Sequence, residues 1–353
     1  MELFSPVQLG ALNLRNRIFM APMTRSRSGD DAVPTDIMID YYRQRATAGL
    51  IVTEGIAPSA NGLGYCRTPG IYSPAQIEAW SKITAAVHGE GGSIVAQIMH
   101  VGRAATVLNK PAGSETVSPS AITARGKIYT DQAGMQVMDA PRALTTSEIA
   151  GVVEEYRQAT ENAYAAGFDG VELHCTSGYL PAQFLSSGSN LREDEYGGDV
   201  AGRTRFVLEV LAAMASVDGP GRVAMRICPD NPFNDLRDDN PQETFDYLLQ
   251  HAARLDLAYL HVIRFPQGRV DNLALGRQYF GDRLVANESY SFEEADALIA
   301  SGEAAAVSFG RFFVANPDLV ARWQQGIALS EFDLATLYTA GPEGYVSYSP
   351  AEG

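Results

Sequence analysis

Eight short apolar runs, separated by stretches with helical periodicity, dominate this chain of 353 residues. The runs are nearly continuous in apolar residues rather than alternating, as expected for parallel strands that are buried on both faces. Several intervening stretches open with helix-start signals, such as Ser73 with Pro74 and Gln76. Eight strands that alternate with helices predict an α/β fold, a (β/α)8 TIM barrel. The runs cover residues 17–23, 50–54, 93–100, 170–174, 222–229, 259–264, 283–287 and 305–310.

A doubly wound sheet is the alternative architecture, but no G-x-G-x-x-G motif follows any of the runs. No linker, low-complexity tract or internal repeat divides the chain, so we expect residues 1–353 to form a single barrel domain. Two connections, 101–144 and 175–198, are too long for simple loops. The first follows the third strand, and we expect it to form an insertion that caps one end of the barrel.

The charge balance excludes several classes of partner. The chain has 27 Lys and Arg against 42 Asp and Glu, whereas nucleic-acid binding requires a basic surface. No apolar run approaches the ~20 residues that a membrane helix needs, and the N-terminus lacks a signal-peptide pattern. The three cysteines lie far apart in the sequence and predict neither disulfides nor a zinc site. We therefore expect a cytoplasmic protein, monomeric or homodimeric, that binds neither nucleic acid nor membrane.

Polar residues at the carboxyl ends of the runs are the candidates for chemistry, because TIM barrels build their active sites there. His174 closes the fourth run, and Ser177 and Tyr179 follow it. Two donors could polarise one carbonyl oxygen while the tyrosine supplies a proton. The alternative is a core histidine satisfied by a backbone carbonyl. The five histidines show no spacing with carboxylates that indicates a metal site.

Several motifs occur in order along almost the whole chain. They are NRIFMAPMTR at 16–25, QIMHVGR at 97–103, GVELH at 170–174 with GYL at 178–180, SNLREDEYGG at 189–198, FGR at 309–311 with ANPDL at 315–319, and LY at 337–338 with EGY at 343–345. Together these motifs resemble the Old Yellow Enzyme family of FMN-dependent ene-reductases. Thr24 resembles the Old Yellow Enzyme branch proper, because another branch of that family has cysteine at this position.

The resemblance implies noncovalent FMN over the strand ends. It places Thr24 near flavin N5 and O4, Gln97 at the pyrimidine end, and Arg226 near N1 and O2. At the phosphate it places Arg311 with the backbone of Gly310, and Asn287 as a further donor. The alternatives are a buried salt bridge for Arg226 and a surface pairing of Arg311 with Asp318. The resemblance also assigns Pro22, Met23 and Gly55 to the flavin edge, and Met99 and Tyr338 to the substrate pocket.

The resemblance also implies the reaction. NADPH or NADH reduces FMN, and flavin N5 then delivers hydride to the β-carbon of an activated alkene, an α,β-unsaturated carbonyl or a nitroalkene. His174 and Ser177 hold the substrate oxygen and Tyr179 protonates the α-carbon. The alternative is a flavin-dependent isomerase or biosynthetic enzyme on the same scaffold, without net nicotinamide consumption. A metal-dependent or phosphosugar barrel enzyme and a non-catalytic flavin-binding protein are further alternatives.

Two positions depart from the family pattern. Family members usually have histidine or asparagine at the position of Ser177, whose hydroxyl has a shorter reach. After the seventh run the family commonly has a glycine-containing turn that meets the phosphate, whereas this chain reads ANESY at 286–290. Glu288 there is unfavourable beside a dianionic phosphate unless its side chain points outward.

Overall fold

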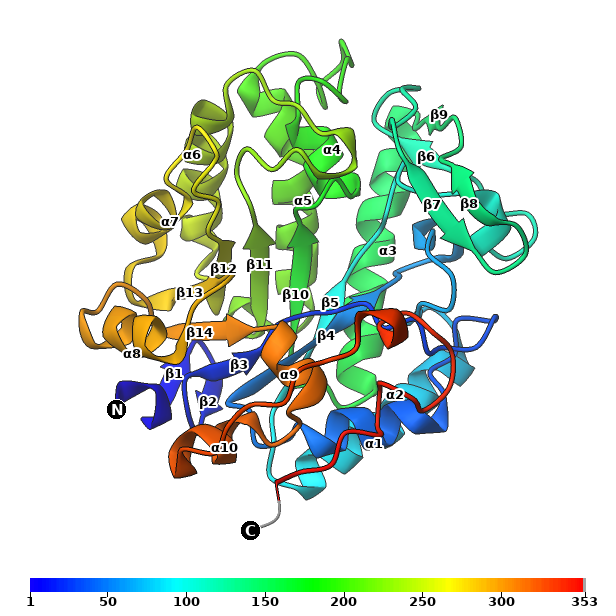
Figure 1. Cartoon of the computed structure of the whole chain (residues 1–353). Coiled ribbons are helices and arrows are strands. Elements are labelled where there is room, and N and C mark those ends of the chain that lie inside the picture. Colours follow the sequence, from blue (N-terminus) through cyan, green and yellow to red (C-terminus); the bar gives the residue numbers. More distant parts are fainter. Residues whose placement is uncertain (352–353) are drawn as a thin grey trace.

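Eight parallel strands close into a barrel in the computed structural model, which describes residues 1–351. All eight predicted runs form its strands, so the (β/α)8 barrel is confirmed and the doubly wound sheet is wrong (Figure 1). The strands are hydrogen-bonded in the order β10 (Gly170–Cys175), β11 (Val223–Ile227), β12 (Tyr259–Ile263), β13 (Leu284–Asn287), β14 (Ala306–Phe309), β3 (Ile18–Met20), β4 (Leu50–Ile56) and β5 (Ile94–Ile98).

Strand pairing brings the polar side chains of the strands to one level. β4, β5 and β10 are buried at every residue, as expected of strands covered on both faces. The register places Glu172 beside Gln97 of β5, and His174 beside Arg226 of β11. Because side chains alternate along a strand, Glu172 and His174 lie on the same face of β10. Four polar side chains from three adjacent strands therefore meet inside the barrel.

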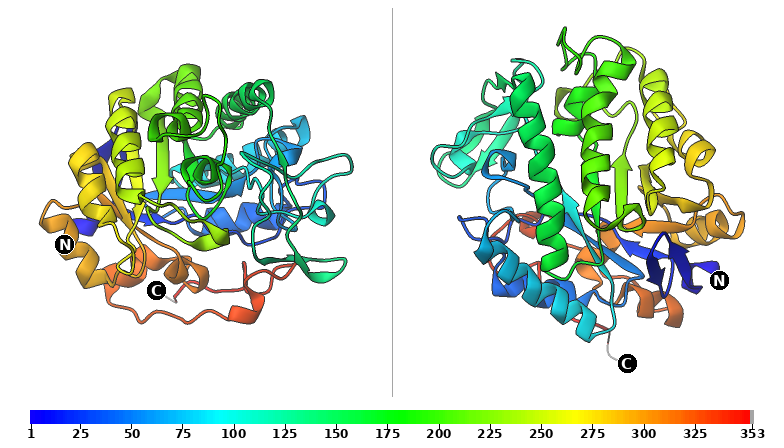
Figure 2. Two further views of the ribbon diagram at one scale, coloured as in Figure 1. Left: turned by 90° about the horizontal axis from the view of Figure 1, so that it is seen from above. Right: turned by 180° about the vertical axis from the view of Figure 1, so that it is seen from behind.

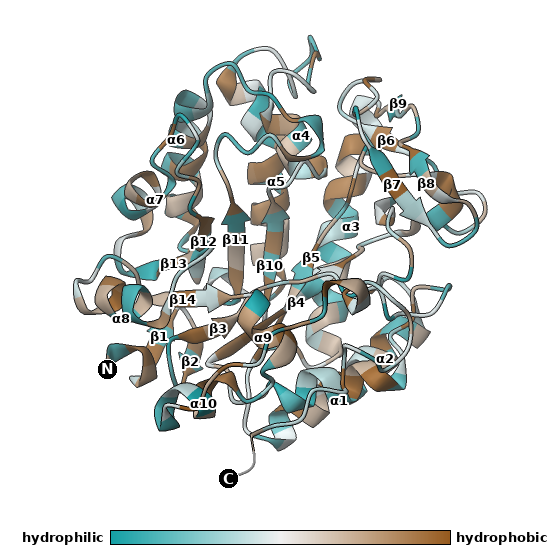
Figure 3. Cartoon of the chain, viewed as in Figure 1, coloured by the Kyte–Doolittle hydropathy of each residue, from teal (hydrophilic) through white to brown (hydrophobic). Residues whose placement is uncertain are grey.

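Helices surround the barrel and begin where the sequence signals them. Ser73 and Gln76 form a capping box at the start of α2 (Pro74–Gly89), and Thr145 and Glu148 form one at α3 (Thr146–Ala165). Figure 3 shows hydrophobic colour along the strands and hydrophilic patches on the helices. Among residues 1–351, no helix has both the length and the apolar character to cross a membrane. The other helices are α1 (Asp36–Gln44), α4 (Leu180–Leu185), α5 (Val200–Asp218), α6 (Pro241–Ala252), α7 (Asn272–Phe280), α8 (Phe292–Ala300), α9 (Arg311–Ala315) and α10 (Leu319–Gln325), with short 3-10 helices at Glu2–Phe4, Ala60–Gly62, Val107–Asn109, Pro220–Arg222, Phe233–Asp235, Ala253–Leu255, Gly281–Arg283 and Leu334–Thr336.

A short antiparallel hairpin, β1 (Val7–Leu9) with β2 (Leu12–Leu14), precedes the first barrel strand. Its leucines form a buried cluster with Phe19, Leu50 and Tyr259, which lie toward the amino ends of their strands. The hairpin therefore covers the amino end of the barrel. The sequence analysis did not predict it, because two strands of three residues give too little alternation to be recognised.

The connection after β5 forms small strands of its own. β7 (Lys127–Thr130) pairs antiparallel with β8 (Gly134–Val137), and β6 (Val117–Ser118) pairs with β9 (Arg142–Ala143). Figure 1 shows this group in blue-green beside α3, away from the barrel strands. That residues 1–353 make one domain with 101–144 as its cap stays a prediction.

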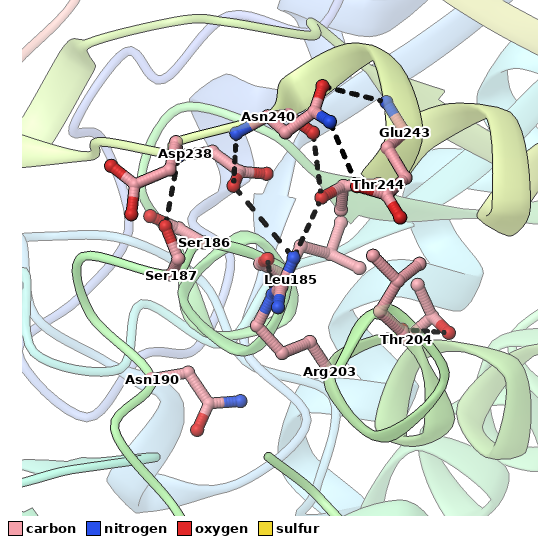
Figure 4. Close-up of polar contacts among 12 residues, drawn as sticks. Leu185, Ser186, Ser187, Asn190, Arg203, Thr204, Asp238, Asn240, Glu243 and Thr244 are labelled. Carbon is pink, nitrogen blue, oxygen red and sulfur yellow. Dashed lines mark hydrogen bonds and ion pairs between the residues drawn. The ribbon is translucent and has the colours of Figure 1, made fainter. Parts of the chain in front are cut away.

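Arg203 of α5 links the connection that follows β10 to helix α6, which comes after β11 (Figure 4). Its Nε donates to the carbonyl oxygen of Leu185 at 3.0 Å, and its Nη2 donates to Thr244 Oγ1 at 3.1 Å. Ser186 Oγ donates to the carbonyl oxygen of Arg237 at 2.6 Å. These bonds fix two loops over the carboxyl end of the barrel, where the chemistry is expected.

Buried Arg27 holds the C-terminal segment, drawn in red in Figures 1 and 2. Its guanidinium donates to the carbonyl oxygens of Thr336 at 2.8 Å, Leu337 at 2.7 Å and Glu343 at 2.9 Å. It also lies 4.8 Å from the ring centre of Tyr345. Burial lowers the pKa of Arg27 to about 10, so the group stays protonated at neutral pH. One planar cation thus organises the segment.

Lysine in place of Arg27 would keep the charge but lose the planar fork that reaches several carbonyls at once. We expect amide hydrogen exchange of residues 334–346 to become at least tenfold faster, because each hydrogen bond to a charged group contributes about 1.5–3 kcal/mol. Exchange in the barrel strands should not change. Arg43→Lys is the matched control, since Arg43 is exposed on α1 and pairs with Asp40 at 2.7 Å. Equal exchange of the segment in both variants would contradict the role of Arg27.

Candidate active site

A cavity of about 1080 Å³ opens at the carboxyl end of the barrel strands. Strand ends, the β7–β8 hairpin and the C-terminal segment all contribute to its wall. Its volume exceeds the roughly 300–1,000 Å³ typical of ligand pockets, so it has room for a cofactor beside a substrate. Asn287 and Gly310 lie outside its lining. The predicted residues that line it are Pro22, Met23, Thr24, Gly55, Gln97, Met99, His174, Ser177, Tyr179, Arg226, Arg311 and Tyr338.

The cavity lining is basic although the chain as a whole is acidic. Arg67 pairs with Asp131 of the hairpin turn and donates to the carbonyl oxygen of Tyr338 at 2.8 Å. The excess of positive charge indicates that the cavity accepts an anionic ligand. Among residues 1–351, no three His, Cys, Asp or Glu side chains gather as a metal site. The basic lining residues are Arg25, Arg67, Lys127, Arg226 and Arg311, and the acidic one is Asp131.

Arg226, at the end of β11, is a buried cation with an unused donor. Its Nη2 donates to Asn287 Oδ1 at 2.6 Å, and Asn287 Nδ2 donates to the carbonyl oxygen of Ser308 at 3.0 Å. Burial lowers the pKa of Arg226, and the charge of Glu172 opposes that change. Within residues 1–351, the buried Nε has no hydrogen-bond partner. Such a group is costly unless a ligand acceptor meets it, which favours the cofactor role over the buried salt bridge.

Glu172, which the sequence analysis did not single out, orients the side chains around it. Its carboxylate accepts hydrogen bonds from Gln97 Nε2 at 2.8 Å, Tyr259 OH at 3.0 Å and His261 Nδ1 at 2.9 Å. Burial opposes its ionisation, but His261 and Arg226 hold the pKa of Glu172 below its usual range. Because Gln97 donates to Glu172, its amide oxygen remains free to accept a hydrogen bond from a ligand.

His174 is buried at the end of β10, and its imidazole is neutral. Burial, together with the nearby Arg226, lowers the pKa of His174 to about 3. Its Nδ1 is buried without a hydrogen-bond partner in the described part of the chain. Its ring packs edge-on against Tyr179, with 4.8 Å between ring centres. A neutral imidazole offers one N–H donor and one acceptor, which suits it to hold a substrate oxygen.

Tyr179 lies in the same cavity wall, within a group of hydroxyls. Its OH donates to Tyr65 OH at 3.3 Å, and Asn234 Nδ2 donates to Tyr65 OH at 3.4 Å. Burial raises the pKa of Tyr179 well above its usual range, so the phenol is protonated at neutral pH. Tyr65 and Asn234 were not predicted, because they come from loops whose sequences carry no periodic signal.

Ser177 occupies an unusual backbone conformation for serine. Its φ is 57°, in the left-handed region where asparagine is favoured over most residues. Its carbonyl oxygen accepts from Asn234 Nδ2 at 2.8 Å, which fixes the turn. The serine side chain lines the cavity beside His174 and Tyr179, so the three predicted residues meet at one site.

The opposite wall is built by β3 and β4. Pro22, Met23 and Thr24 follow β3 directly, and all three line the cavity. A side chain at Gly55 would bring its Cβ within 2.5 Å of Met99 Sδ. The absence of a side chain at Gly55 therefore lets Met99 pack against β4, and both residues form part of the wall.

Arg311 begins α9 immediately after Gly310, and its side chain is 74% exposed. It pairs with Glu288 at 3.2 Å, whereas Asp318 pairs with Arg322 at 2.8 Å. The surface charge pairing considered as the alternative for Arg311 is therefore present, but its partner is Glu288 and not Asp318. Glu288 points toward the corner of the cavity that contains Arg311 rather than away from it.

Comparison with known proteins assigns the family. A family model described as the NADH:flavin oxidoreductase / NADH oxidase family matches residues 2–330. The chain belongs to this family. A probable flavin mononucleotide-dependent alkene reductase of Leishmania infantum is 40% identical over 98% of the chain and 96% of that protein.

Solved structures agree with this assignment. Morphinone reductase in complex with tetrahydroNAD is 43% identical with a TM-score of 0.94, over 100% of this chain and 98% of that one. An old yellow enzyme homologue from Zymomonas mobilis is 40% identical with a TM-score of 0.95, over 99% of this chain and 100% of that one. The Old Yellow Enzyme resemblance is confirmed. The chain is an FMN-dependent ene-reductase that uses a reduced nicotinamide, and the comparisons do not favour the isomerase alternative.

The low pKa of His174 predicts a pH-dependent stability. The unfolded chain takes up a proton near pH 6.5 and the folded chain only near pH 3, so the free energy of unfolding should fall as the pH drops below about 6.5. His174→Gln lacks this titrating group, so at most one fewer proton is taken up on unfolding. The slope of the unfolding free energy against pH should therefore be smaller by up to about 1.4 kcal/mol per pH unit. Denaturant titrations between about pH 4 and 7 measure both slopes. Identical slopes would show that the folded protein protonates His174 normally.

Proposed function

We propose that the cavity binds FMN noncovalently, with Gln97 and Arg226 at the polar end of the flavin and Arg311 at its phosphate. The observation that carries this proposal is the buried Nε of Arg226, unpartnered within residues 1–351 and part of the cavity lining. An acceptor-rich ring edge that becomes anionic on reduction would satisfy this donor. Gln97, oriented by Glu172, offers a complementary acceptor. Pro22, Met23, Thr24 and Gly55 would line the remaining flavin edge.

When bound, FMN supplies hydride chemistry, because it accepts hydride from a reduced nicotinamide and passes it to an activated alkene. The related morphinone reductase structure contains tetrahydroNAD, which supports a nicotinamide in the corresponding cavity of this chain. NADPH as the preferred donor, a monomeric or homodimeric state and a cytoplasmic location stay predictions. Nicotinamide oxidation that requires an added enone would separate the reductase from the isomerase.

His174 and Ser177 hold the carbonyl or nitro oxygen of the substrate. Negative charge develops on that oxygen as hydride reaches the β-carbon, and an N–H or O–H donor stabilises it. The imidazole of His174 is neutral at physiological pH, and its one N–H group can donate this hydrogen bond without the ring being protonated. Its Nδ1 has no hydrogen-bond partner in the described part of the chain, and Arg226 lies beside it on the neighbouring strand. Ser177 adds a second, shorter-reaching donor.

Tyr179 gives a proton to the α-carbon. Its hydroxyl is protonated at neutral pH and lies in the cavity wall beside His174. The Tyr65 hydroxyl accepts a hydrogen bond from Tyr179 OH at 3.3 Å, which orients the Tyr179 O–H group. Exposed apolar side chains surround the mouth, including Phe233, Leu334 and Tyr338, and suit a small apolar alkene. Met99 and Tyr338 complete the proposed substrate pocket.

Phenylalanine at position 179 removes only the hydroxyl. Tyr179→Phe should slow reduction of a cyclic enone on the order of 10²-fold or more, as expected for the loss of a general acid. The rate of flavin reduction by NADPH under anaerobic conditions should stay unchanged. Nitroalkenes should suffer least, because their stabilised anions can be protonated by solvent.

Tyr247→Phe serves as the control for that experiment, since Tyr247 lies on α6, stacks on His251 and is not among the residues that line the cavity. Stopped-flow measurement separates the two half-reactions. Equal losses in flavin reduction and enone reduction would assign Tyr179 a structural role instead of proton donation.

Asparagine at position 177 tests the second oxygen donor. Ser177→Asn is compatible with the left-handed φ of 57° and adds an N–H with a longer reach. We expect simple phenols, whose oxygen would lie between residues 174 and 177, to bind up to about tenfold more tightly, as one added hydrogen bond allows. The charge-transfer band of the bound phenolate reports the affinity. Unchanged phenol binding, with unchanged turnover of small and large enones, would remove residue 177 from the site.

A further inference from the structure

An internal ion pair lies in the corner of the cavity assigned to the cofactor phosphate. Glu288 Oε1 is 3.2 Å from Arg311 Nη2, and Ser289 Oγ donates to the same carboxylate oxygen at 2.6 Å. Both partners are accessible, since the side chains of Arg311 and Glu288 are 74% and 42% exposed. A carboxylate therefore already engages the guanidinium that the phosphate would need.

The turn that carries Glu288 is strained and firmly held. Glu288 has a φ of 89° and Ser289 a φ of 56°, in the left-handed region that favours glycine. Arg264 Nε donates to the carbonyl oxygen of Glu288 at 2.6 Å, and its guanidinium lies 3.8 Å from the ring centre of Tyr290. On the other side, Asn287 is bound by Arg226. These contacts hold the backbone of the turn in place, so the carboxylate leaves Arg311 only by rotation of the Glu288 side chain. Strain kept at such a place points to a function.

We propose that Glu288 competes with the cofactor phosphate for Arg311 and so lowers the preference of this chain for FMN over riboflavin. The inference rests on the proposed binding of the FMN phosphate by Arg311. A phosphate dianion must either displace the carboxylate from Arg311 or bind beside it, and the second case adds like-charge repulsion. Riboflavin carries no phosphate and meets neither cost. Residue 288 thus determines how strongly the site distinguishes the two flavins.

Because Arg311 and Glu288 are exposed to solvent, the competition should also depend on ionic strength. Interactions between exposed charges are screened by salt over a Debye length of about 10 Å at 0.1 M. The penalty that Glu288 imposes on FMN should therefore be largest at low ionic strength. Riboflavin affinity should be insensitive to both residue 288 and salt.

The test compares dissociation constants of FMN and riboflavin, measured by flavin fluorescence on the full chain after flavin removal. Glu288→Gln should tighten FMN binding roughly three- to tenfold at low salt, the range expected for a partly exposed charge near a dianion. Riboflavin binding should not change, and the gain should shrink at about 0.5 M salt. Glu288→Gly should show the same gain and also raise the thermal midpoint, because glycine relieves the positive φ.

Two further variants make the test specific. Glu90→Gln is the charge-matched control, because Glu90 follows α2 at the opposite end of the barrel, and it should leave both constants unchanged. Arg311→Met should weaken FMN binding but not riboflavin binding, and should reduce the gain from Glu288→Gln in the double variant.

The outcomes separate the two proposals. If Arg311→Met leaves FMN affinity unchanged, the phosphate assignment fails and the competition fails with it. If Arg311→Met weakens FMN binding but Glu288→Gln leaves FMN affinity unchanged or lower, the phosphate assignment stands. The competition is then overturned, and Glu288 instead positions Arg311.

Discussion

One buried carboxylate, Glu172, ties together the strands that form the floor of the cavity. Its oxygens receive donors from Gln97, Tyr259 and His261, and His261 Nε2 continues the chain of hydrogen bonds to Ser308 Oγ at 2.7 Å. The network therefore joins β5, β10, β12 and β14. A buried donor that loses its partner costs about 1–3 kcal/mol, so no member can turn away cheaply. This network orients Gln97, which lines the cavity.

Positive charge is then concentrated where ligands enter. Arg226 is fixed by Asn287 and has an Nε without a partner among residues 1–351, while Arg311 is an exposed residue of the same cavity lining. In the same cavity, His174 is kept neutral and Tyr179 is kept protonated by burial. The cations are the groups proposed to hold the anionic cofactor, and the uncharged donors are the groups proposed to meet the substrate. This division suits a reaction in which hydride and proton are delivered to one alkene by different groups.

The barrel and most of the cavity wall could be predicted because buried parallel strands leave apolar runs that end in polar residues. Glu172 was missed although it lies two residues before His174 in one strand, a spacing that places both on one face. Tyr65 and Asn234 carried no comparable signal, since only tertiary folding brings their loops to Tyr179. The departure at Glu288 was visible in the sequence, but its orientation toward Arg311 depends on the contacts that fix the turn.

We expect Glu172, through these hydrogen bonds, to fix the polar frame that receives the flavin ring. Glu172→Gln leaves the volume nearly unchanged but removes the negative charge and replaces one of the two acceptor oxygens with an NH2 donor, so the donors of Gln97, Tyr259 and His261 cannot all be accepted. Flavin titration of this variant, with circular dichroism as a check on folding, tests the claim most directly. The account predicts that affinities for FMN and riboflavin both fall tenfold or more, by equal factors, because Glu172 acts at the ring and not at the phosphate. A folded Glu172→Gln variant with unchanged affinity for both flavins would contradict it.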